Sequence, residues 1–212
     1  MQFNLSTLDP LHRYKLLSST VTPRPIAWVS TIDADGLPNA APFSFFNVFA
    51  EDPPTLAFAI QHRSGTDRKD TGENVRSQGE FVVNLVSEDN VERMNVCAIE
   101  FPPHVDEFAE AGLTPQASTL IRTPRIAESH VAFECRLMRI VELGNMRSLV
   151  RGEVLMMHVR DDAVIDAGRC WIDTRRLALV GRMQGNSYVR TSDVFELPRI
   201  AVEAWSAADH GA

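Results

Sequence analysis

The chain has 212 residues, of which 44% are hydrophobic and 23% charged, values that are usual for globular proteins. Its formal net charge of −7 argues against a nucleic-acid-binding protein, because phosphate backbones are met by clustered lysine and arginine. The N-terminus lacks a signal-peptide pattern, and no apolar run approaches the roughly 20 residues that span a bilayer, which predicts a cytoplasmic protein that does not cross a membrane.

Alternating and β-branched apolar runs predict that most of the regular structure is strand. The first run ends at Asp33-Ala34-Asp35-Gly36, a strong turn signal, so the first two strands should form a hairpin. The expected strands are residues 26–32, 38–46, 55–61, 81–86, 131–141 and 149–159, with short additions at 164–165 and 177–180.

Helical spacing predicts two main helices, over 67–77 and 88–100, and a short one over 106–111. Thr66 or Asp67 would cap the first of them. Many short strands with few helices between them favour a mainly β fold with α additions, an antiparallel barrel with flanking helices. The length predicts a single domain over residues 1–212, with its core at about 14–190 and a polar C-terminal tail.

No familiar catalytic or metal-binding motif is present, and the six histidines show no metal-ligand spacing. We therefore expect no metal site and name no catalytic side chain, so redox chemistry would need a cofactor. The cysteines, Cys97, Cys135 and Cys170, are far apart, and we expect reduced, buried thiols. His158, inside a predicted strand, is interpreted as a hydrogen-bonded strand residue.

Two segments have the composition of an anion site. Arg24 stands between Pro23 and Pro25 on stiff, extended backbone, which suits either a grip on phosphate or a plain surface arginine. The segment 65–71 lies at a predicted helix start, where free N–H groups attract anions, and Lys69 adds a charge. An ordinary capped helix with a solvated turn is the alternative there, and the nearby Arg63 could point inward or into water.

Two further segments could contact a flat aromatic ligand. Residues 41–47 combine phenylalanines with Ser44 and Asn47, so they could form an apolar wall with polar groups at its edge; alternatively, the phenylalanines are all core. Near the end of the chain, Tyr188 follows a segment with two glycines and could stack on a ring, although a plain loop is equally compatible.

Taken in order, these segments resemble the flavin reductase-like FMN-binding split-barrel family, in the branch with the reductase components of two-component monooxygenases. The matching segments are 23–31, 39–46, 69–71 with Asn74, 80–84, 105–108, 133–135, 152–154 with His158, and 182–188. The resemblance implies a homodimeric split barrel with flavin near the subunit interface. Arg24 and residues 66–71 would hold the phosphate, Ser30 and Thr31 would follow the ribityl chain, and residues 41–47 would edge the isoalloxazine.

The cofactor-binding residues expected from motifs and resemblance together are Arg24, Ser30, Thr31, Ala41, Pro42, Phe43, Ser44, Asn47, Arg63, Thr66, Lys69, Asp70, Thr71 and Tyr188. The activity implied is an FMN-dependent flavin reductase that uses NADH or NADPH and supplies reduced flavin, by diffusion or to a partner monooxygenase. The alternatives are a protein that stores FMN, an FMN enzyme acting on a small organic substrate, and a barrel without cofactor.

Overall fold

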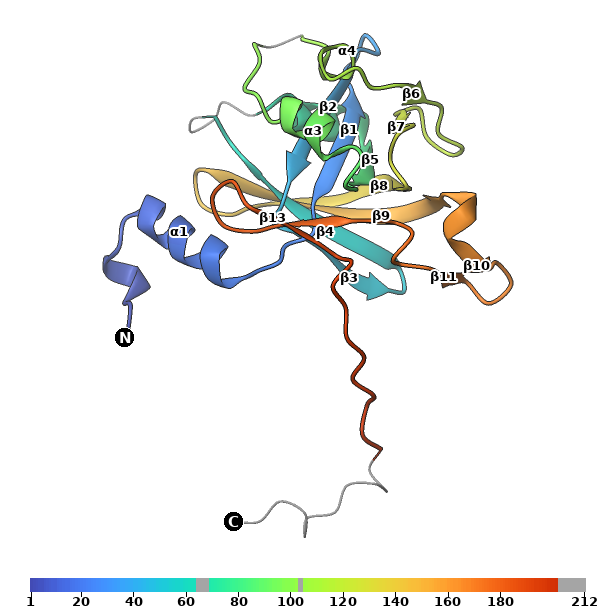
Figure 1. The fold of residues 1–212 in the computed structure, drawn as a ribbon. Coiled ribbons are helices and arrows are strands. Elements are labelled where there is room, and N and C mark those ends of the chain that lie inside the picture. The colour runs from blue at the N-terminus through green and yellow to red at the C-terminus, as the bar shows by residue number, and fades with distance from the viewer. Residues whose placement is uncertain (64–68, 103–104, 202–212) are drawn as a thin grey trace.

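The computed structural model describes residues 1–63, 69–102 and 105–201 (Figure 1). Within them, antiparallel strands form one main sheet in the order β2-β1-β5-β8-β9-β4-β3. Its strands are β1 Ala27–Ile32, β2 Pro38–Phe43, β3 Phe46–Glu51, β4 Pro54–Gln61, β5 Glu80–Leu85, β8 Val131–Glu142 and β9 Arg147–Val159. The mainly β, antiparallel fold predicted from the sequence is confirmed.

The two edges of the sheet, β2 and β3, are neighbours in the chain and bend toward each other. The Phe43 ring at the end of β2 lies 5.3 Å from the Phe58 ring on β4, measured between centroids. The carbonyl of Phe45, in the bend, accepts a hydrogen bond from the Ala59 N–H at 2.9 Å. The sheet therefore curls into a barrel that is open along one side. The prediction of a single strand over 38–46 was wrong, because the backbone turns at Ser44 and Phe45.

Burial on both faces of β1 shows that apolar layers lie on either side of the sheet. Ala27 and Val29 point into the barrel, where they pack with Phe58 and Phe81. Trp28, on the other face, packs under the segments that follow β5. That outer layer comprises Ile26, Trp28, Ala40, Val86, Met94, Cys97, Phe108, Ala111, Leu113, Ile126 and Val180. The helices α3 and α4 lie over this face in Figure 1.

The helices are shorter than predicted, and one was missed. They are α1 Pro10–Thr20, α2 Asp70–Gln78, α3 Val91–Val96 and α4 Glu107–Glu110, with 3₁₀ turns at Leu5–Thr7 and Asp161–Ala163. Short strands β6 Pro115–Gln116, β7 Arg125–Ile126, β10 Val164–Asp166, β11 Trp171–Ile172, β12 Val180–Arg182 and β13 Tyr188–Arg190 complete the regular structure. None of the described helices is long and apolar enough to cross a membrane.

Two local predictions need correction. Lys69 occupies the N-cap position of α2, and its side chain makes no capping bond, so the helix begins after Thr66 and Asp67 rather than at them. Those two residues lie outside the described part, as does the tail over 202–212. Cys97 and Cys135 are buried as expected, whereas Cys170 is exposed, because it lies in the turn between β10 and β11.

Close packing inside the barrel predicts a large cost for one added methyl group. A Cβ at Gly152 of β9 would lie 2.4 Å from the Phe81 ring and 3.4 Å from the Cys135 Cβ. We expect Gly152→Ala to lower the free energy of unfolding by about 1–3 kcal/mol, through overpacking. Urea unfolding of this variant beside Gly168→Ala provides the check, since a Cβ at Gly168 meets nothing closer than 3.4 Å. Equal losses in both variants would contradict the prediction.

Candidate functional site

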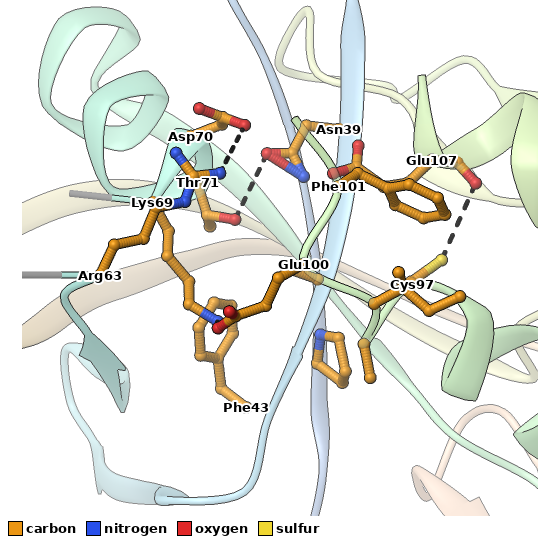
Figure 2. Close-up of a pocket in the computed structure, with 14 residues that line it drawn as sticks. Asn39, Phe43, Arg63, Lys69, Asp70, Thr71, Cys97, Glu100, Phe101 and Glu107 are labelled. Carbon is orange, nitrogen blue, oxygen red and sulfur yellow. Dashed lines mark hydrogen bonds and ion pairs between the residues drawn. The ribbon is translucent and has the colours of Figure 1, made fainter. Parts of the chain in front are cut away.

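The best candidate site is a pocket between β2, the start of α2 and the segment after α3, which we call the α2 pocket (Figure 2). Its lining residues are Asn39, Ala41, Pro42, Phe43, Arg63, Lys69, Asp70, Thr71, Cys97, Ala98, Ile99, Glu100, Phe101 and Glu107. The cavity measures about 100 Å³, below the ~300–1,000 Å³ usual for pockets that enclose a small ligand. It can therefore surround only part of such a ligand.

One side of the α2 pocket is cationic. Lys69 and Arg63 reach into it in Figure 2, Lys69 from the N-cap of α2 and Arg63 from the end of the preceding strand. Each contacts an acid of the same pocket: Lys69 Nζ lies 3.7 Å from Glu100, and Arg63 lies 3.3 Å from Asp70. The N–H groups in the first turn of α2 add the positive end of a helix dipole. A phosphate placed here would compete with these two partly exposed ion pairs.

The other side is apolar. Ala41, Pro42 and Phe43 of β2 form one wall, and Ile99 and Phe101 approach it from the segment after α3. The Phe43 and Phe101 side chains can be followed in Figure 2. An apolar wall of this kind suits a flat ring, because it excludes water from the faces of the ring. Cationic and apolar parts thus meet in a single pocket.

Hydrogen bonds fix α2 against the sheet on which the pocket is built. The Thr71 hydroxyl donates to the Asn39 side chain at 3.4 Å, and the Asn74 amide donates to Thr31 Oγ1 at 3.1 Å. Asn39, Thr71, Asn74 and Thr31 are all buried. These contacts hold the first turn of α2, and with it Lys69, at a constant place beside β2.

Two ionisable groups lie deep in the pocket. Cys97 donates from its thiol to the backbone carbonyl of Glu107 at 3.9 Å. Burial raises the pKa of the Cys97 thiol to about 12, so it is no thiolate nucleophile at neutral pH. Burial also raises the pKa of Glu107 to about 7; backbone N–H groups oppose this rise, and the carboxylates of Asp70 and Asp106 add to it. The Glu107 Oε2 atom is buried, and within residues 1–63, 69–102 and 105–201 it has no hydrogen-bond partner.

The α2 pocket gathers half of the predicted cofactor-binding residues. Those that line it are Ala41, Pro42, Phe43, Arg63, Lys69, Asp70 and Thr71. Thr66 lies outside the described residues. The residues that sequence reasoning missed are Asn39, Cys97, Ala98, Ile99, Glu100, Phe101 and Glu107. The helix breaker at Phe101-Pro102-Pro103 marks where this segment turns, but no local pattern says that it turns onto β2.

Arg24 lies in a different cavity, of about 340 Å³, which it shares with Ser44, Phe45, Asn47 and Leu17 of α1. The Arg24 side chain is buried, and its guanidinium donates to three backbone carbonyls. These belong to Ser18 at 2.5 Å, Val21 at 3.1 Å and Met183 at 3.0 Å. Its Nε contacts the Ser44 hydroxyl at 3.5 Å. Most of its donors are therefore engaged within the protein.

Three other predicted residues lie away from the α2 pocket. Ser30 and Thr31 are fully buried within β1, and the Ser30 hydroxyl donates to the Pro124 carbonyl at 2.7 Å. Tyr188 is half-buried on β13, with the Arg182 guanidinium 4.6 Å from its ring centroid. His158 contacts Glu134 of the neighbouring strand at 2.6 Å, as a strand histidine should. Among the described residues, no group of three or more His, Cys, Asp or Glu could hold a metal ion.

Comparison with known proteins finds a domain model and solved structures that match this chain. The model of the flavin reductase like domain matches residues 18–175. NbaA, a 2-nitrobenzoate 2-nitroreductase from Pseudomonas fluorescens, superposes with a TM-score of 0.89 and 34% identity, covering 98% of this chain and 100% of that one. Nitrilotriacetate monooxygenase component B from Bacillus cereus superposes with a TM-score of 0.88 and 33% identity, covering 93% of this chain and 98% of that one.

A more distant match supports the barrel alone. A split barrel domain protein from Shewanella frigidimarina NCIMB 400 superposes with a TM-score of 0.80 at 22% identity, covering 94% of this chain and 100% of that one. The curled sheet described above is thus a split barrel. Since the domain model spans most of the chain, and two solved structures match nearly all of it at more than 30% identity, the protein belongs to the flavin reductase-like family.

Proposed function

We propose that this protein binds FMN and works as an NADH- or NADPH-dependent flavin reductase. The observation that carries the proposal is the α2 pocket, where a cationic side and an apolar wall meet in a member of the flavin reductase-like family. Lys69, Arg63 and the first turn of α2 would hold the phosphate. Ala41, Pro42 and Phe43 would contact the ring. Bound flavin supplies the hydride-accepting chemistry, and the chain supplies position and exclusion of water.

A second copy of the chain would complete the site. The α2 pocket is too small to enclose FMN, and apolar side chains are exposed on the edge strand β3 and on α1, among them Val48, Phe49 and Leu17. An unpaired edge with apolar side chains is a usual contact between subunits. We therefore propose a homodimer in the cytoplasm, which passes reduced flavin by diffusion or to a partner monooxygenase. The similarity to nitrilotriacetate monooxygenase component B supports such a partner.

The spectrum of FMN-loaded protein, recorded without oxygen, tests the activity. We expect NADH or NADPH to bleach the flavin band, with the faster nucleotide identifying the donor. Flavin that binds and stays oxidised with both nucleotides would instead support a storage protein. If no flavin binds, the proposal fails.

Lys69 offers a test of the phosphate site. Removing one charged contact to phosphate costs about 1.4 kcal/mol, so Lys69→Ala should weaken FMN binding about tenfold. Riboflavin, which lacks the phosphate, should bind both proteins alike. Fluorescence titration gives both affinities, and Lys15→Ala on α1 is a matched control because Lys15 is the other lysine of the chain. An equal loss for both flavins, or no loss for FMN, would contradict this assignment.

Reduction of a small organic substrate is a second candidate, and the similarity to the 2-nitroreductase NbaA favours it. Protein whose flavin has been reduced without oxygen would be mixed with a nitroarene. Prompt return of the oxidised flavin spectrum would support this activity, with one flavin reoxidised per nitroarene reduced to the nitroso compound or two per nitroarene reduced to the hydroxylamine. A reduced spectrum that persists until oxygen is admitted would exclude a nitroarene substrate.

A further inference from the structure

The α2 pocket contains a buried acid, Glu107, which takes no part in the proposed contacts to the phosphate and the ring. Glu107 is the first residue of α4 and lines the pocket; the dashed line in Figure 2 joins its backbone carbonyl, not its carboxyl, to the Cys97 thiol. The residue is 9% exposed, and its Oε2 atom has no hydrogen-bond partner among the residues that the structure describes. Buried polar atoms in folded proteins are almost always paired. Glu107 lines the pocket, so turning this solvent-inaccessible, unpaired oxygen toward a bound ligand would give it the hydrogen-bond partner that it lacks.

The charges around Glu107 decide which form of the carboxyl is present. Burial raises its pKa, and Asp70 of α2 and Asp106 at the start of α4 add negative charge. The charged and titratable groups that line the pocket with Glu107 are Arg63, Lys69, Asp70, Cys97 and Glu100, and Asp106 and Glu110 flank Glu107 at α4. Strand β2 contributes none. The two cations of the pocket contact other acids, Arg63 contacting Asp70 and Lys69 contacting Glu100.

We propose that Glu107 is a ligand-contacting residue whose protonated carboxyl donates a hydrogen bond, through Oε2, to an acceptor atom on the ring of the bound flavin. The inference rests on the proposed function for the identity of the ligand. An ionised carboxylate only accepts hydrogen bonds, whereas a protonated one also donates. Binding would hold the proton on Glu107, so affinity is full at low pH and falls as the pH rises through the pKa of the free protein.

Riboflavin is the appropriate probe, because the phosphate of FMN titrates in the same range. We expect its affinity for the protein, measured by fluorescence titration, to fall about tenfold between about pH 6 and about pH 8.5. Glu107→Gln keeps a hydrogen-bond donor of the same size but has no proton to lose in this pH range. The affinity of this variant for riboflavin should therefore stay constant. Glu107→Met keeps the size and loses the donor, so its affinity should be low throughout.

Glu110→Gln is the matched control, because Glu110 is an exposed acid on the same helix and should leave the pH dependence unchanged. Titration calorimetry in two buffers of different ionisation enthalpy gives a second readout. At about pH 8, the wild type and Glu110→Gln should take up protons on binding, and Glu107→Gln should not. Thermal unfolding would verify that each variant is folded.

The outcomes separate the two proposals. Riboflavin affinity that is independent of pH, that rises with pH, or that retains its slope in Glu107→Gln would overturn the role of Glu107 and leave the flavin site standing. Absence of flavin binding in the wild type would overturn the proposed function, and with it this inference.

Discussion

Replacing Arg24 with alanine is expected to lower the free energy of unfolding by about 3 kcal/mol. The guanidinium donates to the carbonyls of Ser18 and Val21 in and after α1, and to that of Met183, 159 positions further along the chain. Hydrogen bonds from a charged donor contribute about 1.5–3 kcal/mol each, and the desolvation of the buried charge offsets part of that sum. Urea unfolding followed by tryptophan fluorescence would measure the loss.

Arg24→Lys should recover little of the stability, because an ammonium group cannot reproduce the planar fork that reaches several carbonyls at once. Arg139→Ala, at an exposed position of β8, is the control and should change the free energy of unfolding by less than about 0.5 kcal/mol. The phosphate role implied by the family resemblance predicts the opposite: unchanged stability and weaker FMN binding. That result for Arg24→Ala would show that Arg24 serves to bind FMN and that its contacts to backbone carbonyls do not stabilise the fold.

The strands could be predicted from the sequence because their signals are local. The β-branched apolar run over 26–32 and the Asp33–Gly36 turn predict β1 and its hairpin with β2, and the structure has both. The bend at Ser44 and Phe45 could not be predicted, since it arises where the sheet curls and Phe43 packs against Phe58. Curvature depends on contacts between strands that are distant in the sequence.

Only part of the α2 pocket could be predicted, because some of its residues are marked by local sequence signals and others arrive through tertiary packing. Lys69, Asp70 and Thr71 lie at a helix start, which composition reveals, whereas Glu107 reaches the pocket only because α4 packs on the outer face of the sheet. For Arg24 the sequence context predicts an anion site, which stays a prediction, while the structure pairs its guanidinium with the carbonyl of Ser18 in α1 and with those of Val21 and Met183. The N-terminal signals of that helix were present, with Asp9 as N-cap and Pro10 after it.

Glu134 is the other residue whose removal should be costly. It is fully buried on β8, and its carboxylate accepts from the N–H groups of Thr119 at 2.6 Å and Leu120 at 2.7 Å and from His158 at 2.6 Å. The carboxylate thereby ties the segment between β6 and β7 to the sheet. Glu134→Ala should lower the free energy of unfolding by about 3–5 kcal/mol, because it leaves buried donors without an acceptor.

The pH dependence tests whether the charge of Glu134 matters or only its shape. Burial opposes its ionisation, but the Thr119 N–H, His158 and the Leu120 N–H outweigh burial and hold the pKa of Glu134 below its usual range. A lowered pKa in the folded state means that the stabilisation is present above the unfolded value of about 4.5, and is lost as the pH falls through the folded value. Glu134→Gln should therefore lose stability near pH 7 and show a smaller further loss on acidification than the wild type.

Urea unfolding between about pH 3 and about pH 7 would measure these differences, with Glu92→Gln, an exposed acid on α3, as the control. The control should follow the wild type over the whole range, because an exposed carboxylate has a similar environment in the folded and unfolded chain. If the free energy of unfolding of Glu134→Gln falls on acidification as steeply as that of the wild type, other carboxylates cause the acid sensitivity. Glu134 would then hold the 119–120 backbone by its shape and hydrogen bonds alone.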